Sequence, residues 1–124
     1  MILEHARLSV LPGRGSDFLK AFSEAAPIIT SMGGCVDMRL LRCLESEDEF
    51  LLLVEWETVE HNTIGFRESE HYQRWRALLH HFYDPFPEVL HFDDVHFRKQ
   101  AEVNDSVATG NVCLWPPVDE ASVR

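Results

Sequence analysis

The fold of this chain is decided by one short stretch, Phe50-Leu51-Leu52-Leu53-Val54-Glu55-Trp56. Apolar residues fill consecutive positions in it, so as a β-strand it needs cover on both of its faces. In a single domain of this length, helices can cover one face of a sheet. The other face needs a different cover, and a second copy of the chain is the economical candidate. The stretch therefore predicts a central strand in a sheet that pairs with a partner.

The segments on either side of this strand predict a sheet with helices. Residues 2–11 read as a strand with two distinct faces, and residues 35–44 read as an edge strand with one wet face. On that edge strand Val36, Met38, Leu40 and Leu44 form the apolar face. Residues 17–31 show helical spacing of apolar residues, with Ser16 as the expected N-cap, Pro27 as a kink and Gly33-Gly34 at the end.

The second half of the chain continues the same alternation. Thr58 is the expected cap of a short helix over 59–66, followed by a longer helix over 70–82 and a last strand over 89–97. The order β-α-β-β-α-β predicts an α+β, ferredoxin-like antiparallel sheet with both main helices on one face. In that topology the first and third strands are central and the second lies at an edge.

Composition limits the classes of function. The chain has 124 residues, 21 acidic against 11 basic, and a formal net charge of -10. That charge disfavours nucleic acid and anionic membrane surfaces, and no apolar run reaches the roughly 20 residues of a membrane span. Residues 1–97 are expected to form one domain and 98–124 a C-terminal tail of unassigned role. With no signal peptide and no paired spacing of its three cysteines, the protein is expected to be cytoplasmic.

The seven histidines do not predict a metal site. His80 and His81 are adjacent and diverge on a helix, whereas His91 and His96 fall on opposite faces of the last strand. We therefore expect no protein-built metal centre and no cofactor.

Two segments resemble the antibiotic biosynthesis monooxygenase (ABM) family, a branch of the dimeric α/β-barrel superfamily. They are Leu53-Val54-Glu55-Trp56-Glu57, which runs into Thr58-Val59-Glu60-His61-Asn62, and Gly65-Phe66-Arg67-Glu68-Ser69, which leads to the helix through Trp75. The resemblance covers about residues 1–97. It implies a homodimer with a pocket between helices and sheet, and in several members oxygenation of quinols or polycyclic phenols without metal or flavin.

The resemblance also implies which residues act. Phenol-oxygenating relatives use an Asn, a Trp four residues later and a Tyr six residues further on, and Asn62, Phe66 and Tyr72 match that spacing with Phe in place of Trp. We expect Asn62 and Tyr72 to hold and deprotonate a hydroxyl, with His71 as a further proton acceptor. Phe66 and Trp75 are expected to form an aromatic wall. The remaining substrate-binding candidates are His5, Arg7 and Arg76.

Two of these candidates have an alternative interpretation, since His5 and Arg7 point either into the pocket or toward the dimer mate. The haem-degrading branch of the family fits worse. Its members have an Asn on the first strand, a Trp after the third strand and a His ten residues further on, and the corresponding residues here are Ala6, Phe66 and Arg76.

The leading hypothesis is a cofactor-independent monooxygenase of a small quinol-like or polycyclic phenolic substrate, with dioxygen as co-substrate. Two alternatives stay open on the same dimeric scaffold, a non-catalytic small-molecule binding module and an isomerase or lyase.

Overall fold

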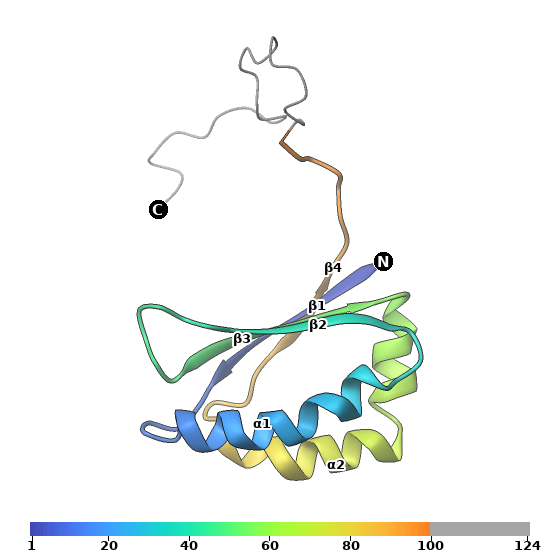
Figure 1. Cartoon of the computed structure of the whole chain (residues 1–124). Helices are drawn as coiled ribbons and strands as arrows, with labels where there is room; N and C mark the ends of the chain where they lie inside the picture. Colours follow the sequence, from blue (N-terminus) through green and yellow to red (C-terminus); the bar gives the residue numbers. More distant parts are fainter. Residues whose placement is uncertain (100–124) are drawn as a thin grey trace. The chain divides into compact units, whose positions relative to one another are not determined.

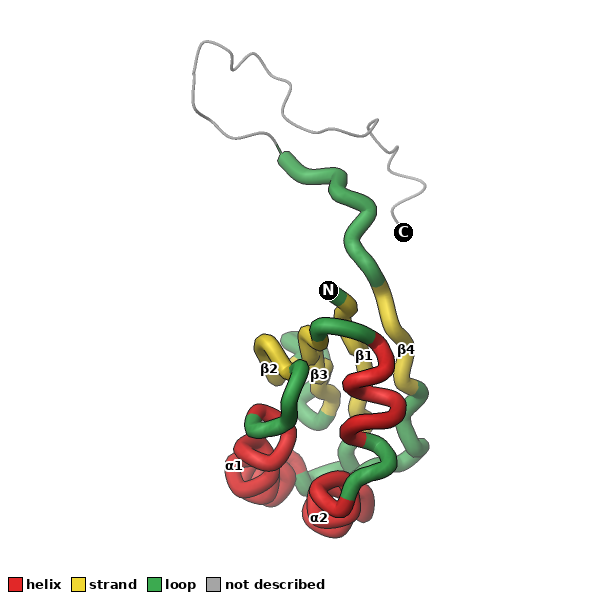
Figure 2. Tube along the Cα trace, turned by 90° about the vertical axis from the view of Figure 1, so that its right-hand side faces the viewer, coloured by secondary structure: helices red, strands yellow, loops and turns green. Residues whose placement is uncertain are grey.

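The computed structural model describes residues 1–99, which contain four strands and two main helices. The strands are β1 (Ile2–Ser9), β2 (Cys35–Arg42), β3 (Glu49–Trp56) and β4 (Val89–Phe92). They form one antiparallel sheet in the order β2-β3-β1-β4 (Figure 2). Helix α1 (Gly15–Thr30) and helix α2 (Glu70–Leu79) both lie on one face of that sheet (Figure 1). The predicted ferredoxin-like α+β fold is confirmed, with the first and third strands central.

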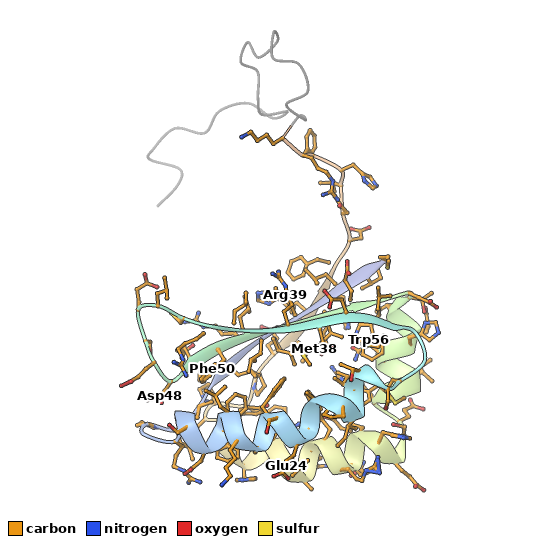
Figure 3. All side chains as sticks on the ribbon, in the orientation of Figure 1. Glu24, Met38, Arg39, Asp48, Phe50 and Trp56 are labelled. Atoms are coloured by element: carbon orange, nitrogen blue, oxygen red, sulfur yellow. The ribbon has the colours of Figure 1, made fainter. Side chains whose placement is uncertain are left out.

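The core lies between this sheet face and the helices. Strand β3 alternates between buried and half-buried side chains, and Phe50, Leu52, Val54 and Trp56 all face the helices. Met38, Phe50 and Trp56 lie on the helix side of the sheet in Figure 3, whereas Arg39 lies on the opposite side. The side-chain period of two thus separates a packed face from an outer face.

The outer face of the sheet is rich in apolar side chains that no described residue covers. Leu51 and Leu53 of β3 are half-buried there, and Leu41, Leu90 and Phe92 are 40%, 44% and 47% exposed. The prediction that β3 is apolar on both faces is thus confirmed. It leaves an apolar surface to be accounted for.

Several local predictions need correction. Helix α1 begins at Gly15 after Arg14, which makes no side-chain cap, so Ser16 is not the N-cap; the Phe18 N–H bonds to the Arg14 carbonyl and draws the chain into the helix early. A β-bulge between Cys35 and Asp37 shifts the β2 register and leaves Val36 45% exposed. Leu44 lies beyond the strand and is 93% exposed, so neither residue belongs to the apolar face.

The second helical region is less regular than its spacing predicted. The helix over 59–66 does form, and Thr58 Oγ1 accepts the His61 N–H at 3.3 Å. Its main part, η1 (His61–Phe66), is a π-helix in which the Arg67 N–H bonds to the Asn62 carbonyl at 3.0 Å. The predicted helix over 70–82 ends as α2 at Leu79 and continues as a 3-10 turn, η2 (His80–Phe82).

The last strand is shorter than predicted, since β4 ends at Phe92 rather than at residue 97. The compact unit runs from Met1 to Asp93, and Asp94 begins a second unit. The proposed tail lies outside the described residues from position 100 onward, so the boundary after Phe97 stays a prediction. Within the described part of the chain, no helix has the length and apolar character needed to cross a lipid bilayer.

Gly34 makes a close approach that fixes the η1 helix against the start of β2. Its φ is +88°, and a Cβ there would lie 2.2 Å from Cγ of His61. The Glu57 N–H also bonds to the Gly34 carbonyl at 2.8 Å. Only glycine allows this packing.

Replacing Gly34 by alanine is expected to lower the free energy of unfolding by at least about 1–2 kcal/mol, because a left-handed alanine is strained and its Cβ clashes with His61. The neighbouring Gly33→Ala is the matched control: nothing lies within 4 Å of its Cβ position, and a change within about 0.5 kcal/mol is expected. Urea unfolding measures both. The double variant Gly34→Ala/His61→Ala should recover part of the loss. Equal stability of Gly34→Ala and Gly33→Ala would contradict this packing.

Candidate functional site

A pocket of about 230 Å³ lies between the helix side of the sheet and the segment that runs from η1 to β4. Strands β1 and β3, helix α1, the end of η1, and the chain from α2 to the start of β4 all contribute. Its lining combines a polar group with an apolar wall. The polar residues are Glu4, Arg67, Tyr72, His80 and Tyr83. The apolar residues are Ala6, Leu8, Ile29, Leu52, Phe66, Trp75, Phe86, Pro87 and Val89.

Glu4 is the one charged residue on the packed face of β1 and is only 5% exposed. Its Oε1 accepts a 2.8 Å hydrogen bond from Trp56 Nε1, on the neighbouring strand. Burial raises the pKa of the Glu4 carboxyl; the Trp56 hydrogen bond and the positive charge of Arg67 oppose this rise. The pocket therefore contains a carboxylate that binds protons more readily than an exposed glutamate.

Arg67 supplies the positive charge of the pocket. It follows η1 directly, and its guanidinium lies 6.0 Å from the centre of the Tyr72 ring. No carboxylate among the described residues comes within ion-pair distance of it. An unpaired guanidinium beside an aromatic wall is suited to hold an oxyanion of a ligand.

The opposite end of the pocket is an aromatic cluster around His80. The imidazole ring is 4.9 Å from Phe86, 5.7 Å from Tyr72 and 5.8 Å from Tyr83, measured between ring centres. Burial, with help from the positive charges of Arg76 and Arg67, lowers the pKa of His80 to about 4. Burial raises the pKa of Tyr83 far above its usual range. At neutral pH this end is therefore uncharged and able to pack against an apolar ring.

Asn62 lies on η1 with its side chain fully buried. It forms a 2.8 Å hydrogen bond between its Oδ1 and Nε2 of His91, on β4. This bond requires a proton on Nε2. The Asn62 Nδ2 group has no hydrogen-bond partner among the described residues. Burial, and secondarily the charge of Arg67, lowers the pKa of His91.

The structure brings three of the expected site residues together. Phe66, Tyr72 and Trp75 all line the pocket, and the Phe66 ring meets Tyr72 and Trp75 edge-on at 5.3 Å and 5.8 Å between centres. Asn62 is buried on the same helix as Phe66 but is not part of the pocket lining.

The other expected site residues lie elsewhere. His71 and Arg76 are exposed on α2. His5 and Arg7 lie on the outer face of β1, opposite Glu4, and Arg7 pairs with Glu49 of its own chain at 3.0 Å. His5 meets Phe92 edge-on at 5.5 Å between ring centres. Of the two interpretations of His5 and Arg7, the outer face is therefore the one the structure shows.

Sequence reasoning did not select Glu4, Arg67, His80, Tyr83, Phe86 or His91. Glu4 did carry a signal, because it is a lone charge on the strand face shared with Ala6, Leu8 and Val10. The position of His80 had no such signal, since it depends on the change from α-helix to 3-10 turn after Leu79. In residues 1–99 there is no group of three His, Cys, Asp or Glu side chains that could hold a metal ion.

Comparison with known proteins identifies the family. Residues 1–78 match the family described as antibiotic biosynthesis monooxygenase. The chain is also 52% identical over 95 residues to the uncharacterized protein YczJ of Bacillus subtilis, a match that covers 77% of this chain and all of YczJ. This chain belongs to the antibiotic biosynthesis monooxygenase family.

Solved structures agree with this assignment. A protein from Bordetella bronchiseptica that carries the same family name is 35% identical, with a TM-score of 0.72 over 76% of this chain and 96% of the other. SnoaB, a cofactor-independent oxygenase from Streptomyces nogalater, shares the fold at 17% identity, with a TM-score of 0.63 over 77% of this chain and 93% of SnoaB.

The low pKa of His80 gives a prediction for pH. The folded state takes up the His80 proton less readily than the unfolded state, so this residue makes the free energy of unfolding decrease as pH falls from about 6.5 to about 4. A proton NMR titration should show the imidazole resonance of His80 moving with a midpoint near pH 4. In the Arg76→Gln variant the midpoint should rise, because one of the repelling charges is gone. A wild-type midpoint at the ordinary value of 6.5 would contradict the described packing.

Proposed function

We propose that this chain is a cofactor-independent monooxygenase that acts on a small quinol-like or polycyclic phenol bound in the pocket, as a homodimer. The observation that carries the proposal is the composition of the pocket. An aromatic wall of Phe66, Tyr72 and Trp75 stands beside a small polar group that can bind a hydroxyl and its anion. Membership in the family supports the activity class, and SnoaB, with the same fold, is described as a cofactor-independent oxygenase.

The reaction needs no group beyond the substrate and dioxygen. Loss of the hydroxyl proton gives an electron-rich anion, which passes one electron to dioxygen. The resulting pair recombines to form a carbon–oxygen bond at the ring carbon para to the hydroxyl. Cleavage of the peroxide O–O bond with loss of the hydrogen at that carbon leaves one oxygen as the quinone carbonyl and releases the other as water. The protein has to favour the anion and keep water away from the peroxide.

Tyr72 is placed to serve this chemistry. It lines the pocket at the N-terminal turn of α2, where the Ser69 side chain caps the helix by accepting the Tyr72 N–H at 3.2 Å. Its phenol can donate a hydrogen bond to the oxyanion of the substrate. Asn62 does not line the pocket, so we propose for its buried, unpartnered Nδ2 donor a ligand contact that requires a rearrangement of η1 on binding.

The proposal is tested with an oxygen electrode. Purified protein treated with a chelator is offered anthrone and 1-naphthol, in whose phenolic forms the carbon para to the hydroxyl carries hydrogen, and oxygen uptake is compared with formation of the quinone product. Uptake of one dioxygen per quinone formed supports monooxygenation. Saturable binding with neither uptake nor product would indicate the binding-module alternative, and a change of substrate without uptake would indicate an isomerase or lyase.

Tyr72→Phe is expected to lower kcat for oxygen uptake on the order of 10²-fold, since it removes a donor to the developing anion. Asn62→Ala is expected to act in the same direction. The control is His71→Ala, one position earlier on the same helix but exposed and outside the pocket lining; it should keep wild-type kcat and KM. If Tyr72→Phe and Asn62→Ala both match the wild type, the roles proposed for them are wrong.

The dimer proposal rests on the outer face of the sheet. Leu53 lies at its centre on β3, paired across the sheet with His5 on one side and Arg39 on the other. Leu41, Leu90 and Phe92 extend the apolar surface over β2 and β4. A second copy that packs its own outer face here would give the two-sheet barrel that the family resemblance implies.

Leu53→Glu is expected to convert the dimer to a folded monomer at micromolar concentration, because it buries a charge in the middle of the apolar dimer surface. In the monomer the new carboxylate is exposed to water and lies beside Arg39 and His5, so the fold should tolerate it. Light scattering after gel filtration measures the mass. Leu44→Glu is the matched control, since Leu44 is 93% exposed beyond the end of β2, and it should stay dimeric. A monomeric wild type would contradict the dimer.

A further inference from the structure

We propose that Glu4 is the proton acceptor of the pocket, and that it takes the hydroxyl proton of a neutral phenol or enol whose anion is then held by Arg67. This inference rests on the proposed function, because it names the base and the substrate class of the same site. Glu4 was not among the residues that the family resemblance implied. The argument depends on its position, its single hydrogen bond and the other groups that line the pocket.

The geometry of Glu4 leaves one oxygen free for a ligand. Trp56 Nε1 donates to Oε1 at 2.8 Å and fixes the carboxylate in one orientation. The described residues provide no other hydrogen bond to this carboxylate. Oε2 is not among their fully buried polar atoms without a partner, and Glu4 lines the pocket, so Oε2 keeps accessible surface there. A carboxylate with one oxygen anchored and the other facing a cavity is arranged to accept a proton from a bound hydroxyl.

The other polar groups of the pocket are less suited to this role. Tyr72 and Tyr83 are phenols and act as proton donors at neutral pH. His80 is held among aromatic rings and resists protonation, since its pKa lies near 4. The guanidinium of Arg67 has only hydrogen-bond donors and cannot accept a proton. Among the described lining residues, Glu4 is the one anionic group.

Groups from each element around the pocket can influence the protonation of Glu4. The titratable and polar groups concerned are Cys35 on β2, Trp56 on β3, Arg67 after η1, His91 opposite Glu4 on β4, Tyr72 on α2, His80 on η2, and Tyr83. Arg67 carries the one permanent positive charge in this set. Burial raises the pKa of the Glu4 carboxyl despite Arg67 and Trp56, so Glu4 accepts a proton more readily than a solvated glutamate does.

The proton transfer keeps the charge of the pocket constant. Before it, the pocket holds the Glu4 anion, the Arg67 cation and a neutral substrate. The O–H bond of the substrate breaks, its electron pair stays on the substrate oxygen, and an O–H bond forms on Glu4. Afterwards Glu4 is neutral and the negative charge lies on the substrate, which Arg67 and the Tyr72 hydroxyl stabilise.

This charge balance defines the substrate class. A neutral hydroxyaromatic enters a pocket with one positive and one negative group. A molecule that already carries a carboxylate would place a second anion beside Glu4 in a buried site, which is unfavourable. The pocket therefore selects neutral phenols or enols over their carboxylated analogues, such as 1-naphthol over a hydroxynaphthoic acid.

The test measures ionisation of a bound phenol without oxygen. Full-length protein is titrated anaerobically with 4-nitrophenol, whose neutral and anionic forms absorb at different wavelengths, over a range of pH below the pKa of the free phenol. Wild type should take up the neutral phenol together with its proton, which moves to Glu4 in the pocket. The bound phenol should therefore show the anion spectrum, with a Kd that changes little with pH. In Glu4→Gln the anion has to come from solution, so Kd should rise about tenfold for each pH unit lost.

Two further variants control the result. Glu24→Gln changes a glutamate on the exposed side of α1 (Figure 3) and should keep the wild-type spectrum and pH profile. Arg67→Gln should lose the anion spectrum at the same pH, because the anion loses its counter-charge. Glutamine keeps an oxygen to accept the Trp56 N–H, and thermal melting checks that each variant is folded.

The inference is overturned if 4-nitrophenol does not bind to wild type, if the bound phenol keeps its neutral spectrum, or if Glu4→Gln shows the wild-type pH profile. Should Glu4→Gln fail to fold, the wild-type spectrum and Arg67→Gln still decide it. Failure of the monooxygenase proposal reads differently: the bound phenol ionises in a Glu4-dependent way, yet no substrate of the panel takes up oxygen.

Discussion

The pocket depends on how one buried carboxylate is accommodated between the two central strands. Glu4 pairs with Val54 across the β1–β3 ladder, which brings Trp56 to a diagonal position on the same face. Its indole N–H supplies the hydrogen bond that the carboxylate needs once it leaves water. No described ion pair completes the compensation, so part of the desolvation cost remains. A residue held at such a cost in a pocket is characteristic of function rather than of stability.

The same alternation along β1 connects this pocket to the outer face of the sheet. Glu4 and Ala6 line the pocket, whereas His5 between them lies on the apolar surface where the partner is proposed to pack. Strand β3 repeats this arrangement, with Leu52 lining the pocket and Leu53 on the outer face. Because β1 and β3 contribute to both surfaces, dimer packing would hold in place the two strands that set the Glu4–Trp56 contact.

Periodicity was sufficient to predict the order of elements, whereas the pocket positions of Phe66, Tyr72 and Trp75 were predicted with the help of the family resemblance. Periodicity was not sufficient for Glu4, which stands out as a lone charge on the apolar face of residues 2–11, because alternation does not show that this face borders a pocket. His80 was missed for a different reason, since a 3-10 turn after Leu79 rotates the following side chains. The β-bulge after Cys35 likewise exposed Val36, which strict alternation had placed inside.

The π-helix η1 explains how the polar groups of the pocket belong together. Its wide turn bonds the Arg67 N–H to the carbonyl of Asn62, whose side chain bonds to His91 on β4. His91 is in turn the cross-strand neighbour of Glu4. The cation and the carboxylate of the pocket are therefore joined through a continuous chain of backbone and side-chain contacts, although they form no ion pair with each other. Such a chain fixes the elements that carry the two charges, and both charges line the pocket in which a neutral hydroxyaromatic would separate its own charge.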